Sequence, residues 1–148
     1  RAELHDRGTQ YLLLLAGCAE LAAERADPGE ADSLRTLLPA VDDPVGDWRH
    51  ADAELWLSVA ALTQSSRATR EVVRLEADFG MIVRIPLSDP EVRARTVLAH
   101  QRLIDAIEAG DPDAARRCAR AHLQTTLDRV ARTQAEVHDR HRIPRSAS

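Results

Sequence analysis

Residues 89–123, DPEVRARTVLAHQRLIDAIEAGDPDAARRCARAHL, contain the clearest signals of secondary structure in the chain. This stretch opens with the tripeptide DPE at 89–91, and a second tripeptide of this kind, DPD, follows at 111–113. An aspartate that can cap, then a proline and an acid, is typical of a helix N-terminus. Gly110 separates the two halves at a point where glycine commonly ends a helix. The stretch therefore predicts two consecutive helices, of which the second runs to about Val137.

The residues before this stretch divide into four further helices by the spacing of their apolar residues. We expect these helices from about Thr9 to Arg25, from about Asp27 to Leu38, through Asp52 to Leu62, and from about Ser66 to Val83. Residues 82–87 are β-branched enough for a short strand, but nothing else in the chain offers a strand partner. The sequence thus predicts an all-α fold, an antiparallel bundle of about six helices in one domain over residues 1–148, with residues 138–148 as a frayed tail.

Composition limits the kinds of protein that this chain can be. Its 148 residues are 44% hydrophobic and 30% charged, which suits one globular domain. The basic residues are all arginine, the formal net charge is -4, and no basic run is present, so we expect no DNA binding by this segment itself. Cys18 and Cys118 form no metal-binding pair, and the longest apolar run is far shorter than the roughly 20 residues of a membrane span. We expect a soluble protein of the cytoplasm.

Three titratable residues lie on helix faces that should point inward. Asp52 precedes Trp56 by four positions, and His100 precedes Ile104 by four. His122 follows Cys118 by four positions, on the less charged face of the last helix. Each therefore shares the apolar side of its helix, where a polar residue is the informative exception.

These three residues should also converge. His100 stands about as far before Gly110 as His122 stands after Pro112, so an antiparallel pair of helices would bring the two imidazoles to one level. A buried carboxylate such as Asp52 needs a partner or a ligand. The alternative is that each histidine is a core residue that is hydrogen-bonded to a backbone carbonyl or to Asp52.

Residues 100–123 resemble a known family, the C-terminal effector-binding domain of FCD type found in FadR-like GntR transcription regulators. The matching features are the histidine, an apolar pair, Ala-Ile, Gly-Asp, Ala-Ala and a closing His-Leu. Residues 20–25 and 51–55 give weaker support. The resemblance covers nearly the whole chain and implies an all-helical domain, a homodimer, a pocket for a small organic acid, and an upstream winged-helix DNA-binding domain that this chain lacks.

Many members of that family hold a divalent metal with an aspartate, a histidine four residues later, and one histidine on each of the last two helices. Carried over by position, the ligands here are Asp52, His100 and His122, for zinc, nickel or manganese. Trp56 occupies the place of the fourth ligand and would be a wall of the pocket instead. In a pocket without metal, the histidines and Arg84 would meet the carboxylate of the effector directly.

The resemblance implies a sensor that controls DNA binding through a partner domain, not an enzyme. Two other functions remain open at this point. A site with two histidines and an aspartate could activate a water molecule for hydrolase or lyase chemistry. Trp56 could equally mark a dimerisation module whose pocket no longer binds anything.

Overall fold

The computed structural model describes residues 2–142, which form six α-helices and two 3-10 helices and contain no strand. The elements are α1 (Ala2–Arg25), α2 (Pro28–Ser33), η1 (Leu34–Leu37), α3 (Val45–Leu62), α4 (Ser66–Val83), η2 (Ile85–Ser88), α5 (Pro90–Glu108) and α6 (Pro112–Arg140). The all-α fold class predicted from the sequence is confirmed. No described helix has the length and apolar content needed to cross a membrane.

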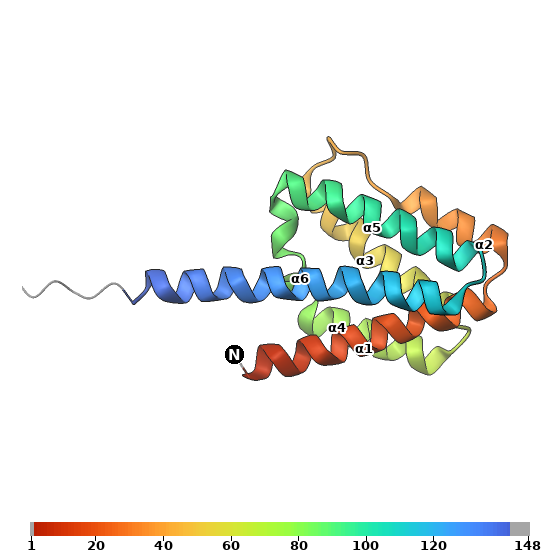
Figure 1. Cartoon of the computed structure of the whole chain (residues 1–148), viewed down its shortest axis with the longest axis horizontal. Helices are drawn as coiled ribbons and strands as arrows, with labels where there is room; N and C mark the ends of the chain where they lie inside the picture. The colour runs from red at the N-terminus through yellow and green to blue at the C-terminus, as the bar shows by residue number, and fades with distance from the viewer. Residues whose placement is uncertain (1, 143–148) are drawn as a thin grey trace, which may run out of the picture.

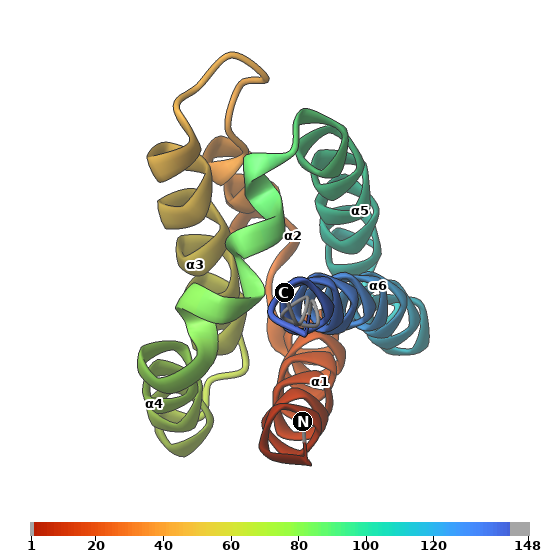
Figure 2. The same cartoon turned by 90° about the vertical axis from the view of Figure 1, so that its left-hand side faces the viewer.

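The helices pack around an apolar core, and Figures 1 and 2 show how they are arranged. α6 packs along both α1 and α5, whereas α3 packs against α1 and α4. In the end-on view of Figure 2, α3 and α4 form one side of the bundle, and α1, α5 and α6 form the other. The interior between α3, α5 and α6 is therefore where side chains from three separate parts of the chain can meet.

The helix ends follow the predicted sequence signals. The Asp89 side chain accepts a hydrogen bond from the Glu91 backbone N–H at 2.9 Å, and Asp111 accepts one from Ala114 at 3.0 Å. Gly110 has a φ of 66°, the left-handed conformation that ends α5. These caps satisfy backbone groups that a helix leaves free at its ends. They set the short turn that makes α5 and α6 antiparallel neighbours.

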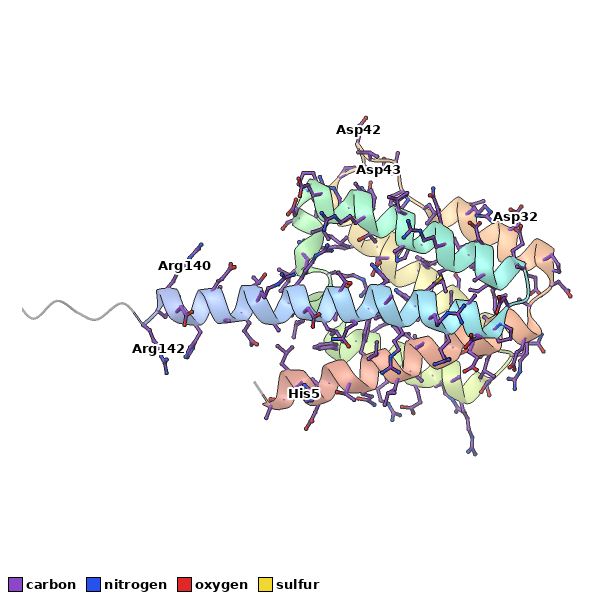
Figure 3. The ribbon with its side chains drawn as sticks, in the orientation of Figure 1. His5, Asp32, Asp42, Asp43, Arg140 and Arg142 are labelled. Atoms are coloured by element: carbon purple, nitrogen blue, oxygen red, sulfur yellow. The ribbon has the colours of Figure 1, made fainter. Side chains whose placement is uncertain are left out.

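The bounds of the first and last helices differ from the prediction. α1 begins at Ala2 instead of Thr9, because its first turns pack against α6, where Gly8 lies buried beside Leu127. α6 continues through Arg140 and so includes residues 138–140 of the tail expected from the sequence, while residues 143–148 of that tail lie outside the described part of the chain. Figures 1 and 3 show this last part of α6 projecting beyond the other helices, with Arg140 near its end.

The segment between α4 and α5 is helical and not a strand. α4 ends at Val83, as predicted, and η2 follows at Ile85–Ser88 with Pro86 in its first turn. Residues 2–142 contain no strand with which this β-branched segment could form a sheet. Its backbone hydrogen bonds are instead made locally, in a 3-10 turn. The turn places Arg84 at the C-terminal cap of α4, where its side chain is buried.

We predict opposite effects of the same substitution at two glycines. Gly110→Ala should lower the free energy of unfolding by about 1–2 kcal/mol, because an alanine is strained in the left-handed region. A Cβ there would meet its nearest atom at 3.7 Å, so crowding adds little. Gly17→Ala, inside α1 with nothing within 4 Å of an added Cβ, should raise stability by about 0.5–1 kcal/mol. Urea unfolding followed by circular dichroism measures both; equal signs would contradict the assignment.

Candidate metal and effector site

Three helices bring the predicted site residues together in the interior. Asp52 comes from α3, His100 from α5 and His122 from α6. Each offers a ligand atom, and these atoms all lie within 4.8 Å of one another. The two imidazole rings have centroids 5.0 Å apart and meet edge to face. The convergence expected from helix phase is thus present in the folded chain.

Both histidines are held in the neutral form. Burial lowers the pKa of His100 against the opposing effect of Asp52. Burial, followed by the neighbouring His100, lowers the pKa of His122 to about 4. A neutral imidazole keeps a nitrogen lone pair, and this is the form that coordinates metal ions.

One nitrogen in this cluster is buried without a hydrogen-bond partner in the described residues. His100 Nε2 lies 3.4 Å from Asp52 Oδ1, but the two atoms do not form a hydrogen bond. An unpaired buried polar atom costs free energy, so its presence needs an explanation. The alternative of a core histidine satisfied by Asp52 is therefore not what the geometry shows at Nε2.

The donor set fits a divalent transition metal. Ligand atoms about 2.1 Å from one tetrahedral ion lie about 3.4 Å apart, so the present separations of up to 4.8 Å need to contract by about 1.4 Å or less. Two imidazole nitrogens with one carboxylate oxygen suit zinc, nickel or manganese. Asp52, His100 and His122 are the residues that would hold the ion, with further positions left for water or for a ligand's carboxylate.

Trp56 lies beside this cluster and fills the place where a fourth ligand is expected. It is buried, and its ring meets that of His100 edge to face with centroids 6.2 Å apart. Indole offers no ligand to a metal, so this side chain acts as an apolar wall. The contact also restrains the orientation of the His100 ring.

Arg84 is in the site but is already occupied by two carboxylates. Its Nε lies 2.9 Å from Asp52 Oδ2 and its Nη1 lies 2.5 Å from Glu76 Oε2. Burial alone would lower the pKa of Arg84, but Asp52 and Glu76 outweigh this effect and raise it. Its Nη2 is buried and without a partner among the described residues, so this nitrogen is left to donate further.

Sequence reasoning missed the part of this network that lies on α4 and α1. Glu76 accepts a hydrogen bond from the Tyr11 hydroxyl at 3.0 Å. Gly80 gives the ion pair its space, since a Cβ there would lie 2.5 Å from Arg84 Nη1 and 2.6 Å from Glu76 Oε2. Glu76 could have been found, because it stands four residues after the buried Val72 and so shares the apolar face of its helix.

The space inside the site is small. Asp52, Trp56 and His122 line a cavity of about 20 Å³ together with side chains of α1, α5 and η2. A cavity needs roughly 10–15 Å³ to hold one water molecule, whereas small-molecule pockets are about 300–1,000 Å³. In this conformation the cavity therefore admits a water or an ion but not a whole organic acid.

Comparison with known proteins supports the interpretation as a regulator. The family model described as "FCD domain" matches residues 11–125. The chain is 31% identical over 144 residues to the "Putative L-lactate dehydrogenase operon regulatory protein" of Escherichia coli (strain K12), covering 87% of this chain and 53% of that protein, and the same figures hold for the protein of that name in Shigella flexneri. It is 24% identical over 133 residues to the "Putative HTH-type transcriptional regulator RmpR" of Mycobacterium gastri, covering 85% of this chain and 47% of that protein. The chain thus spans about half the length of these relatives.

The buried ion pairs generate a stability prediction. Arg84→Leu leaves Asp52 and Glu76 without their cation in the interior, and this should cost about 3–5 kcal/mol of unfolding free energy. The matched control is Arg74→Leu, which removes an exposed ion pair with Glu71 at 3.4 Å and should cost at most about 1 kcal/mol. Urea unfolding at pH 7 compares the two variants. Similar losses would mean that the buried network contributes no more than a surface pair.

Proposed function

Because this chain belongs to the FCD domain family of GntR-type regulators, we propose that it senses a small organic acid and passes the signal to a DNA-binding domain. The observation that carries the proposal is the convergence of Asp52, His100 and His122 in the interior of the bundle. We propose that these residues hold a divalent metal as part of the receptor. The regulator names of the relatives favour sensing over catalysis.

The contacts of Asp52 support a role as a metal ligand. Arg84 holds Oδ2 at 2.9 Å, while Oδ1 faces His100 Nε2 at 3.4 Å. One oxygen is thus fixed, and the other is directed toward the imidazoles. A bound divalent metal would supply a Lewis acid that binds the effector's carboxylate. Arg84 acts as the outer partner that orients a ligating carboxylate, a common arrangement around metal sites.

A receptor without metal is the second candidate, and Arg84 is the observation that favours it. Its guanidinium already neutralises Asp52, and Trp56 replaces a ligand. In this arrangement His100, His122 and the free Arg84 Nη2 would bind the effector's carboxylate by hydrogen bonds. The two candidates differ in whether a metal ion binds before the acid does.

Titration calorimetry with zinc and with nickel separates these candidates. We expect the wild-type chain to bind one ion, and His100→Ala and His122→Ala to abolish binding while the helical circular dichroism signal stays. Trp56→His should strengthen binding about tenfold or more, because it restores a fourth ligand. His50→Ala is the control, since the His50 side chain is 78% exposed and should not contribute.

The possible results of this titration have different meanings. Zinc binding that persists in the His100 and His122 variants would place the ion elsewhere and remove the metal centre. If no variant binds metal but L-lactate still changes Trp56 fluorescence in a His122-dependent manner, the receptor is metal-free. L-lactate is the first acid to use because the name of the relative from Escherichia coli refers to an L-lactate dehydrogenase operon.

We also propose that the domain forms a homodimer through the projecting part of α6. Beside it, α1, α4, η2 and α6 line an apolar groove of about 410 Å³ that includes Ile85 and Val137, each 49% exposed. Two such grooves related by a two-fold axis would cover each other's apolar residues.

Sedimentation should show a dimer that Ile85→Asp and Val137→Asp convert to monomer, while Val41→Asp on an exposed loop should have no effect. A wild-type chain that is monomeric at micromolar concentration would contradict the proposal.

A further inference from the structure

A second groove lies on the outer face of the α5–α6 pair and is lined by arginines. It has a volume of about 580 Å³. Two arginines come from α5 and two from α6, with an apolar residue and a histidine between them: Arg95, Arg102, Arg117, Arg129, Leu98 and His122. No carboxylate is among its lining residues. The sequence contains no basic run, but the antiparallel packing of two helices assembles a cationic surface from separate positions.

Most of this positive charge is not neutralised. Within the described part of the chain, Arg95, Arg102 and Arg129 have no carboxylate oxygen within 4 Å, and only Arg117 is paired, with Asp113. The whole chain has a formal net charge of -4, so such a concentration of unpaired arginine is a local feature. Unpaired cations that line one concave surface attract anions and raise their local concentration.

The groove adjoins the interior site. His122 and Arg129 line both the outer groove and the small internal cavity. Arg129 is half-buried, and its charge contributes, after burial and His100, to lowering the pKa of His122. These two side chains therefore form part of the wall between the groove and the cluster of Asp52, His100 and His122. A ligand seated in the groove would lie against a residue of the interior site.

The four arginines fall into two pairs, one at each end of the groove. Since α5 and α6 are antiparallel and His100 is level with His122, Arg95 lies near the level of Arg129, and Arg102 lies near the level of Arg117. Seven residues of α5 separate the two ends, a rise of about 10 Å. Each arginine side chain reaches several ångström along the groove, so a molecule with two carboxylates a few atoms apart can pair with the arginines of both ends at once.

We propose that this groove binds a small organic anion with two or more carboxylate groups, with one carboxylate against His122 and Arg129. The inference rests on the proposed function and names the class of its ligand. The groove volume lies within the roughly 300–1,000 Å³ of small-molecule sites. A second copy of the chain is a poor occupant, because a two-fold axis would place like charges against each other.

Titration calorimetry with citrate, succinate, L-lactate and inorganic phosphate, on the full chain saturated with zinc, tests the groove. We expect citrate to bind at least tenfold more tightly than L-lactate, and its affinity to fall as sodium chloride is raised. Arg95→Gln with Arg102→Gln should weaken citrate binding tenfold or more, because the variant removes two cations that line the groove. The fold should be kept, because both side chains are exposed and neither supports the core. The matched control is Arg67→Gln with Arg70→Gln, two exposed arginines of α4, which should bind citrate as the wild type does.

Several results would overturn the groove assignment and leave the proposed function intact. One such result is that L-lactate binds as tightly as citrate, and that this binding is lost in His100→Ala but kept in the groove variant Arg95→Gln with Arg102→Gln. Phosphate binding as tightly as citrate would indicate a general anion surface. A groove variant that loses binding to a short DNA duplex while citrate binding is unchanged would assign the groove to nucleic acid. Conversely, citrate binding that depends on the groove but persists in His100→Ala without zinc would support the groove and remove the metal receptor.

Discussion

A carboxylate buried in the bundle requires a cation, and Arg84 supplies it for two carboxylates at once. The side chains of Asp52 and Glu76 are 13% and 9% exposed, and each lies within hydrogen-bond distance of the 6% exposed guanidinium. This network joins Asp52 of α3 to Glu76 in the middle of α4 and to Arg84 at the C-terminal cap of α4. Gly80 gives it space, and the Tyr11 hydroxyl of α1 donates to its outer carboxylate. The positions of three helices around the site therefore depend on one arginine.

The network also fixes the chemistry available at the site. Because Arg84 takes Oδ2 of Asp52, only Oδ1 faces the two imidazoles, which burial keeps neutral. Trp56 packs against His100 and occupies the remaining side. The ligand cluster is thus preorganised by a salt bridge on one flank and by an aromatic wall on the other. Such fixed partners allow a small number of ligand atoms to act together.

Helix phase and capping residues are local properties of the sequence, and they predict the helices and the inward-facing positions of Asp52, His100 and His122. The similar distances of His100 and His122 from the turn between α5 and α6 then predict that the two imidazoles meet. The length of α1 was not predictable in this way, because residues 2–8 depend on packing against Leu127, which is distant in the chain. The ion pairs of Arg84 and the arginine groove were missed for the same reason. Their members are far apart in sequence and come together only when the helices pack.

Formal charge distinguishes the two receptor models that this geometry allows. Asp52, Glu76 and Arg84 together carry a formal charge of -1, and the two neutral imidazoles add none. An organic anion entering this interior without a metal would meet a carboxylate whose one cation is already shared. A divalent ion reverses the sign of the cluster and makes it attractive to a carboxylate. The outer groove already has the attractive sign, so a metal inside and an anion approaching past Arg129 form the electrostatically consistent arrangement.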